Sequence, residues 1–227
     1  MFPLFADRRD AGRQLAGRLQ YLASRPDLVV LALPRGGVPV GYEVAEALGA
    51  PLDVFVVRKL GVPGHQELAM GAVASGGVRV VNQEVVRQLG VSRETFDTVT
   101  DTERRELERR EREYRRGRPF PDLRGTTVVL VDDGVATGST MLAAVHAVRE
   151  LGPVAVVVAA PVMSPEAQEA LARVADRCER VVAPEPLIGV GMWYDDFTQT
   201  TDDEVRTLLS EATHRPSPGE VRHAGGS

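Results

Sequence analysis

The sequence has one cysteine, Cys178, among 227 residues. A single cysteine excludes a disulfide within the chain, and such scarcity is typical of reducing compartments, so we expect a cytoplasmic protein. Long apolar runs are also absent, because the longest, around 154–162, has the length of a strand and is too short to span a bilayer. Residues 1–9 lack the apolar core of a secretion signal. We therefore expect a soluble, intracellular protein with no membrane partner.

Positive charge is not in excess, because 27 Lys and Arg residues stand against 32 Asp and Glu and give a net charge of -5. A broad nucleic-acid-binding surface needs clustered basic residues that acids do not balance, so we expect no nucleic-acid partner. The sequence also lacks a Gly-x-x-x-x-Gly-Lys-Ser/Thr loop, and no Gly-x-Gly-x-x-Gly fingerprint follows an expected strand. These absences argue against a P-loop NTPase and a dinucleotide-binding protein.

What the chain does contain is an alternation of short apolar runs with helical patterns. Strands are expected over 28–33, 52–57, 127–131, 154–160 and 180–183, and helices over 7–24, 40–48, 139–151, 166–175 and 201–212. This alternation predicts an α/β fold, with a parallel sheet covered by helices on both faces. The length suits a single domain over 1–212. Residues 213–227, rich in Pro, Gly and charge, are expected to form a disordered tail.

Two stretches depart from the alternation. Residues 58–77 are rich in glycine with little helical pattern, so we expect a long loop containing one short strand near 71–74, which pairs with 78–81. Residues 92–118 interleave Glu and Arg at spacings of four and carry only a thin apolar stripe. We interpret 92–118 as a long, mostly solvated helical insertion, because the near balance of charge argues against a nucleic-acid-binding arm.

Residues 128–140, Val-Val-Leu-Val-Asp-Asp-Gly-Val-Ala-Thr-Gly-Ser-Thr, join an expected strand to an expected helix. In open parallel sheets ligands bind beyond the carboxyl ends of the strands, where this loop lies. The free N–H groups and dipole of a helix N-terminus suit a phosphate, and Gly134 and Gly138 allow the backbone to curl around it. Hydroxyl donors are added by Thr137, Ser139 and Thr140.

The two acids of this string, Asp132 and Asp133, would repel a phosphate and need other partners. Vicinal hydroxyls suit them, because each hydroxyl can donate a hydrogen bond to a carboxylate oxygen. A structural interpretation, in which the acids cap a turn, would suffice for an Asp-Asp pair alone. The complete string between a strand and a helix instead predicts a site for ribose 5-phosphate.

The string resembles the signature of the phosphoribosyltransferases of type I fold: four apolar residues, two acids, a short loop and Thr-Gly-x-Thr before a helix. The resemblance implies an enzyme of nucleotide metabolism that binds phosphoribosyl diphosphate with Mg²⁺. The enzyme would transfer the phosphoribosyl group to a small nitrogen acceptor, such as a purine or related base, and release diphosphate. Asp132 and Asp133 would then hold the ribose hydroxyls, and Ala136, Thr137, Gly138, Ser139 and Thr140 the 5-phosphate. Asp133 would also assist proton removal. Mg²⁺ would bind mainly through the substrate, with both acids as candidate ligands. Dimerisation is common in the family, so the resemblance also implies a homodimer.

Two further segments fit this resemblance. Leu33-Pro34-Arg35-Gly36-Gly37 is similar to the family's diphosphate loop, which often has a cis peptide, and Arg35, Gly36 and Gly37 would contact diphosphate. The basic residues Arg58 and Lys59 end an expected strand and would meet the same group. The resemblance thus implies catalytic roles for Arg35 and Lys59 beside Asp133. It also implies a mobile flap over 59–77, from which His65 and Glu67 would contact substrate.

The family's small hood, which clamps the acceptor, would correspond to residues 184–200. Ile188, Trp193 and Tyr194 are the candidates for the acceptor pocket, although the same side chains would also serve to pack the hood on the core. The flap lacks the tyrosine of adenine- and hypoxanthine-type members, so the resemblance leaves the acceptor open. The alternative is a non-catalytic regulator that binds phosphoribosyl diphosphate or a nucleotide on the same fold.

Overall fold

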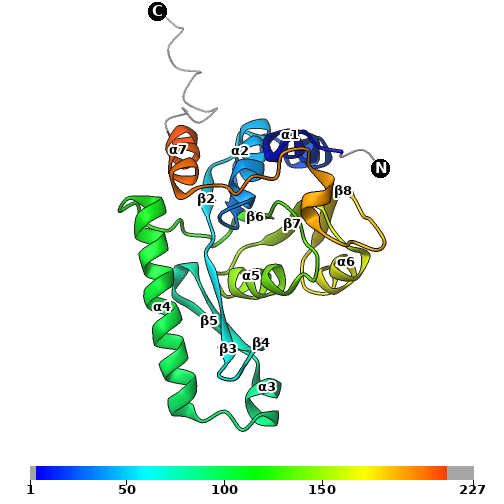
Figure 1. The fold of residues 1–227 in the computed structure, drawn as a ribbon. Helices are drawn as coiled ribbons and strands as arrows, with labels where there is room; N and C mark the ends of the chain where they lie inside the picture. The colour runs from blue at the N-terminus through cyan, green and yellow to red at the C-terminus, as the bar shows by residue number, and fades with distance from the viewer. Residues whose placement is uncertain (1–3, 214–227) are drawn as a thin grey trace, which may run out of the picture.

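The structure is a computed structural model that describes residues 4–213, without the side chains of residues 66 and 67. Its centre is a five-stranded parallel sheet (Figure 1). Across the sheet the strands are β2 Leu52–Val54, β1 Leu28–Ala32, β6 Thr127–Val131, β7 Ala155–Val162 and β8 Arg177–Val182. The predicted α/β fold with a parallel sheet is confirmed. The predicted tail lies outside the described residues, apart from Thr213.

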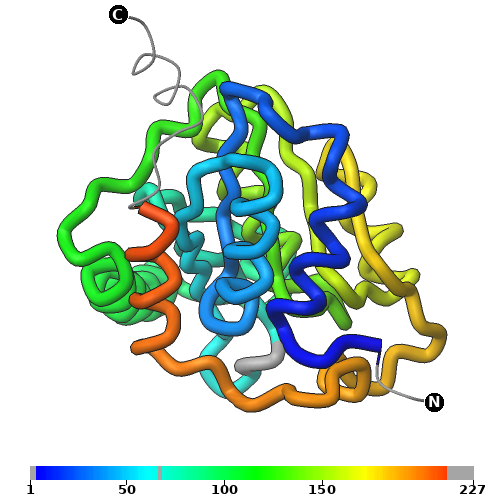
Figure 2. The backbone as a smooth tube through the Cα atoms, turned by 90° about the horizontal axis from the view of Figure 1, so that it is seen from above, coloured from blue at the N-terminus to red at the C-terminus, as the bar shows by residue number. Residues whose placement is uncertain are grey.

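Helices cover both faces of this sheet. On one face lie α1 Arg8–Arg18, α2 Gly37–Leu48 and α7 Asp202–Thr213, and on the other α5 Ser139–Glu150 and α6 Pro165–Ala172. Figure 2 shows α1, α2 and α7 side by side, with residues 184–200 (orange) passing the first turns of α1 and α2. No helix of residues 4–213 combines the length and apolar character that crossing a membrane requires.

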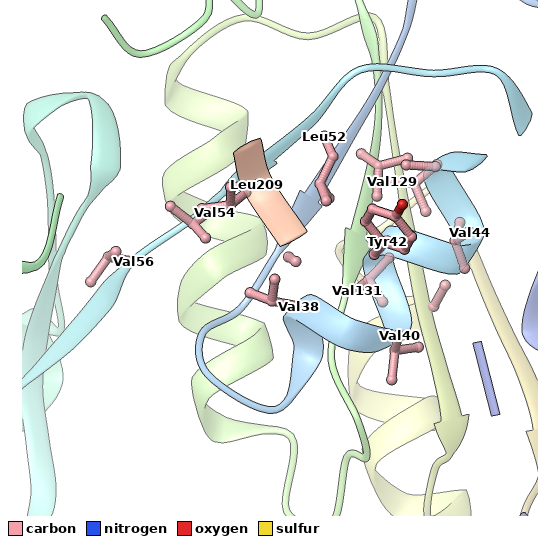
Figure 3. Close-up of a cluster of buried hydrophobic side chains, with 14 of the residues drawn as sticks. Val38, Val40, Tyr42, Val44, Leu52, Val54, Val56, Val129, Val131 and Leu209 are labelled. Atoms are coloured by element: carbon pink, nitrogen blue, oxygen red, sulfur yellow. The ribbon is translucent and has the colours of Figure 1, made fainter. Parts of the chain in front are cut away.

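The strands are apolar runs because both of their faces are buried. In β6, Val129 and Val131 pack under α1, α2 and α7, whereas Val128 and Leu130 pack under α5 and α6. Figure 3 shows the first of these cores, in which Val38, Val40, Tyr42 and Val44 of α2 gather with Val129, Val131 and Leu209. Because β6 is buried on both faces, its position in the sheet is fixed, and so is the position of its last residue, Val131, from which the next loop starts.

Residues 58–77 are not the predicted long loop. They belong to an antiparallel sheet of β3 Val57–Val62, β4 His65–Ala74 and β5 Val78–Val81, in that order. Glycine misled the prediction: Gly71 lies inside β4, where a Cβ atom would overlap the carbonyl oxygen of Val80 on the paired strand. The predicted pairing of 71–74 with 78–81 is confirmed. The predicted strand 52–57 is wrong in extent, because β2 ends at Val54 and β3 begins at Val57 in the other sheet.

The predicted helix within 92–118 is confirmed as α4 Arg93–Arg115, which follows the short α3 Gln83–Gln88. Ser92 caps α4 by accepting a hydrogen bond from the Thr95 N–H, and the apolar stripe of α4 packs on the β3–β5 sheet and on α7. We call β3, β4, β5, α3 and α4 the arm, which extends away from the parallel sheet in Figure 1. Its bounds as an insertion, and those of the single domain, stay predictions.

Candidate functional site

Two loops meet at one edge of the parallel sheet. The β1–α2 loop (33–36) follows Ala32, and the β6–α5 loop (132–138) follows Val131, its partner on the neighbouring strand. The Leu33 N–H donates to the Val131 carbonyl oxygen at 2.8 Å, so the pairing of the strands continues into the loops. The segments that carry the predicted phosphate and ribose residues are therefore adjacent in space.

The β6–α5 loop is anchored so that several of its N–H groups stay open. The Val135 N–H donates to the Val162 oxygen at 2.8 Å, and the Ser164 hydroxyl donates to the Ala136 oxygen at 2.7 Å. Gly138 has φ 74°, a left-handed conformation that glycine adopts without strain, and α5 begins directly after it. Within residues 4–213, no group accepts a hydrogen bond from the N–H of Ala136, Thr137 or Gly138. These donors at a helix N-terminus suit an anion.

The loop begins with Asp132 and Asp133, which we call the acid pair. Asp132 Oδ1 accepts from the Asp133 N–H at 2.9 Å, and Asp133 Oδ2 accepts from Arg8 Nε at 2.8 Å. Burial raises the pKa of Asp132, and the charge of Asp133 raises it further. Burial also raises the pKa of Asp133, while the Arg8 guanidinium opposes that rise. In the described part of the chain no group of three or more His, Cys, Asp or Glu residues could hold a metal ion.

Glycine allows the β1–α2 loop to approach the acid pair. A Cβ atom on Gly36 would overlap the Asp133 carboxylate, and one on Gly37 would lie 2.7 Å from the Val131 oxygen. The Pro34–Arg35 peptide is cis. The N–H groups of Arg35 and Gly36 donate to no acceptor that the structure describes. Open N–H groups therefore occur in both of the loops that meet at the acid pair.

The Arg35 side chain points toward the start of α7, where its Nη1 lies 3.6 Å from Asp202 Oδ2. Asp202 also accepts a hydrogen bond from Tyr114 of α4 at 2.6 Å. Arg35 lines a cavity of about 360 Å³ together with Glu113, Gln199, Thr200, Thr201, Asp202, Asp203 and Arg206. Arg35 thus directly precedes Gly36, which approaches Asp133, while its guanidinium contacts the start of α7.

Arg58 and Lys59, predicted to act together, lie on opposite faces of β3 because successive side chains of a strand alternate. Lys59 Nζ is 3.4 Å from Ser139 Oγ, at the first residue of α5. Arg58 Nη2 is instead 2.6 Å from Glu103 Oε2 of α4, a contact within the arm. The structure therefore brings Lys59 to the β6–α5 loop and leaves Arg58 away from it. The sequence did not reveal this difference because the segment was predicted as a loop.

The predicted acceptor residues separate in a similar way. Tyr194 is buried, and its hydroxyl donates to the Asp133 carbonyl oxygen at 2.6 Å. Burial raises the pKa of Tyr194, which keeps the hydroxyl protonated as a donor. Ile188 is 80% exposed, and Trp193 is partly buried in the 3-10 helix Val190–Trp193. Tyr194 therefore holds the acid pair in place, whereas Ile188 and Trp193 remain accessible.

The two predicted flap contacts lie on the arm. His65 begins β4, after the turn at Gly64, and Glu67 lies in the same strand with its side chain outside the described residues. The hairpin that carries them pairs from Val57 to Ala74, with irregular register on either side of Gly61. The described hydrogen bonds of the acid pair involve Arg8 and the Asp133 N–H, and His65 is not among these partners.

One residue of the site was missed from the sequence. Arg8 joins the acid pair to the hood segment, because its Nη1 donates to the Thr198 oxygen at 2.7 Å and its guanidinium lies 3.9 Å from the centroid of the Phe197 ring. A signal was available, since Arg8 opens α1 and a cation in the first turn is disfavoured by the helix dipole. An arginine in that position points to a role outside the helix.

Residues 8–195 match the phosphoribosyl transferase domain family. Two Mycobacterium tuberculosis proteins, named "Putative phosphoribosyl transferase Rv0571c" (strain H37Rv) and "MT0597" (strain CDC 1551), are each 49% identical over 212 residues, covering 93% of this chain and 47% of theirs. The chain thus spans about half the length of these curated relatives. The crystal structure of TT1426 from Thermus thermophilus is 44% identical, with a TM-score of 0.83, covering 93% of this chain and 99% of that one.

Proposed function

The chain belongs to the phosphoribosyl transferase domain family, and we propose that it binds phosphoribosyl diphosphate with Mg²⁺ and transfers the phosphoribosyl group to a nitrogen acceptor, releasing diphosphate. One observation carries the proposal: two loops with open N–H groups follow the ends of neighbouring strands, and one of these loops begins with an acid pair. Phosphate, diol and diphosphate are the groups that such an order of donors and carboxylates would bind.

Each part of the donor has a proposed partner. The N–H groups of Ala136, Thr137 and Gly138 would hold the 5-phosphate, with the hydroxyls of Ser139 and Thr140 as further donors. The acid pair would accept hydrogen bonds from the two ribose hydroxyls. The N–H groups of Arg35 and Gly36, with the ammonium of Lys59, would contact the diphosphate and stabilise the charge it gains as it leaves.

Magnesium is proposed on the chemistry of the acid pair. Carboxylate oxygens are ligands that Mg²⁺ accepts, but two carboxylates do not fill an octahedral site. The ion would therefore take its other ligands from the diphosphate and from water. When bound, it would supply positive charge to the leaving group. The ion would bind mainly through the substrate, with Asp132 and Asp133 as the candidate ligands from this chain.

The proposed reaction is a displacement at the anomeric carbon. The bond from this carbon to a diphosphate oxygen breaks, the bond from the acceptor nitrogen forms, and the nitrogen then loses a proton. Asp133 is the candidate to take that proton, directly or through water. The accessible side chains of Ile188 and Trp193 are the candidates to contact the acceptor, for which we propose a purine or related base.

Two measurements test this proposal. Calorimetric titration with phosphoribosyl diphosphate and Mg²⁺ should show binding that is lost when Asp132→Asn and Asp133→Asn are combined. A diphosphate-release assay over a panel of bases and amines should then find an acceptor. Absence of binding would contradict the donor site, whereas binding without release across the panel would favour the non-catalytic regulator. A cytoplasmic location and a homodimer stay predictions of the sequence.

A further inference from the structure

Arg8 is held on three sides and is not a solvated surface cation. Its Nε donates to Asp133 Oδ2 at 2.8 Å, its Nη1 donates to the Thr198 oxygen at 2.7 Å, and its guanidinium stacks on Phe197. Its side chain is 11% exposed and that of Asp133 is 17% exposed. A guanidinium fixed by two hydrogen bonds and an aromatic ring has one geometry, so it can impose that geometry on its partner.

The partner is the Asp133 carboxylate, which is also confined from the opposite side. Gly36 lies so close that any side chain there would overlap the carboxylate, and a Cβ atom would be 3.2 Å from Arg8 Nε. The Tyr194 hydroxyl fixes the backbone of Asp133 through its carbonyl oxygen. Arg8, Gly36 and Tyr194 together leave the carboxylate little freedom to rotate.

Of the four carboxylate oxygens of the acid pair, two accept a hydrogen bond from the described chain and two do not. Asp132 Oδ1 is engaged by the Asp133 N–H, and Asp133 Oδ2 is engaged by Arg8. Within the described chain, no donor engages the second oxygen of either carboxylate. One acceptor oxygen on each of two adjacent acids matches a pair of vicinal hydroxyls, each of which has one hydrogen to donate.

We propose that Arg8 is a positioning residue, which orients the Asp133 carboxylate so that the acid pair accepts one hydrogen bond from each ribose hydroxyl. The inference rests on the proposed function and adds a residue of α1 to its donor site. Without Arg8 the Asp133 carboxylate would lose the hydrogen bond that fixes Oδ2, and the free oxygen would no longer be held in one direction.

Calorimetric titration with ribose 5-phosphate and with Mg²⁺–phosphoribosyl diphosphate tests the proposal. Arg8→Met should weaken both affinities by roughly tenfold near neutral pH, the loss of one charge-assisted interaction. Arg8→Lys, which keeps the charge but not the planar set of donors, should recover only part of the lost affinity. Arg13→Met is the matched control, since Arg13 is on the same helix, is 57% exposed and lies outside the site.

A double-mutant cycle separates action through Asp133 from a general loss of structure. If Arg8 acts through Asp133, the loss of ligand affinity caused by Arg8→Met should largely disappear in an Asp133→Asn background. Equal binding by Arg8→Met and the wild type would overturn the inference, and so would additive effects in the cycle. If the wild type binds neither sugar phosphate, the proposed function fails and the inference fails with it.

Discussion

Lys59 Nζ lies 3.4 Å from Ser139 Oγ, although 80 residues separate them in the chain. The arm thereby places a cation at the N-terminus of α5, next to the open N–H groups of the β6–α5 loop. Arg58, the preceding residue, is directed to Glu103 on the opposite face of β3. The pair Arg58 and Lys59 therefore allows the two faces of one strand to be tested separately.

Lys59→Met is expected to weaken the binding of Mg²⁺–phosphoribosyl diphosphate by roughly tenfold or more, because a cation that would face the diphosphate is removed. The affinity for ribose 5-phosphate should fall as well, because Lys59 Nζ lies beside Ser139, which is proposed to bind the 5-phosphate. Arg58→Met should alter neither affinity and should act on thermal stability through the loss of its contact with Glu103. Calorimetry with both ligands and a thermal melt decide this, and a larger affinity loss in Arg58→Met would contradict the assignment.

Gly36→Ala is expected to abolish donor binding, since the added methyl group would displace the Asp133 carboxylate. The displacement should also lower the free energy of unfolding, because Asp133 would lose its contact with Arg8. Gly17→Ala is the control: nothing lies within 4 Å of its added methyl group on α1, and a helical Gly→Ala change should stabilise by about 0.5–1 kcal/mol. Retention of wild-type affinity by Gly36→Ala would show that the loops can separate without loss of function.

Arg115→Met is expected to destabilise the protein by about 3 kcal/mol, because it leaves Asp53 half of a broken buried ion pair. Arg115 is 4% exposed, donates to Asp53 and to the Val54 oxygen, and so joins α4 to the edge of the parallel sheet. Urea denaturation measures the change. The exposed Arg109 of the same helix should be replaceable by Met with stability close to that of the wild type.

The counterpart of Arg115→Met is the double variant with Asp53→Asn, which removes the stranded charge as well. It should recover part of the lost stability, since burial alone raises the pKa of Asp53 and Arg115 opposes that rise. If the double variant is less stable than Arg115→Met, the hydrogen bonds of Asp53 and not its charge are responsible for the effect.

Asp132→Asn is expected to stabilise the protein at pH 7 while weakening donor binding. The folded-state pKa of Asp132 is raised above its ordinary value of 3.8, so the folded protein holds this proton more tightly than the unfolded chain does. The stability that this binding contributes is present at low pH and is lost as the pH rises through the folded-state pKa. Asparagine never ionises and keeps the oxygen that accepts from the Asp133 N–H. The gain should be on the order of 1 kcal/mol at pH 7.

Urea denaturation near pH 7 and again at roughly pH 3.5 tests the sign, since the gain should shrink toward the lower value. A destabilisation of equal size at both values would show that the charge of Asp132 is not the cause. The comparison also separates function from stability, because the affinity for phosphoribosyl diphosphate should fall in the variant that unfolds less readily.

The parallel sheet and the phosphate-binding string could be predicted because their signals are local. Each central strand is a short apolar run, and the string from Val128 to Thr140 is continuous in the sequence. The arm could not be predicted in the same way. Gly71 indicates a loop when read alone, and only the approach of Val80 on the paired strand explains a glycine inside β4.

The site residues divide along the same line. Asp132, Asp133 and Gly138 follow from one segment, whereas the contacts of Arg8 depend on Asp133 and Thr198, which are 125 and 190 residues away. Arg58 was assigned with Lys59 because alternation applies only once a segment is recognised as a strand. Tyr194 was noted for its ring, but its hydrogen bond to the Asp133 backbone depends on how the hood segment folds back.

The hydrogen bond between Arg8 and Thr198 also bears on the order in which contacts form while the chain is synthesised. During synthesis Thr198 leaves the ribosome 190 residues after Arg8. In the nascent chain α1 therefore lacks this hydrogen bond while β6, α5 and the arm are being synthesised. The contact cannot form before Thr198 is made, so a ribosome-bound chain that stops short of Thr198 lacks one of the two hydrogen bonds that hold the Arg8 guanidinium.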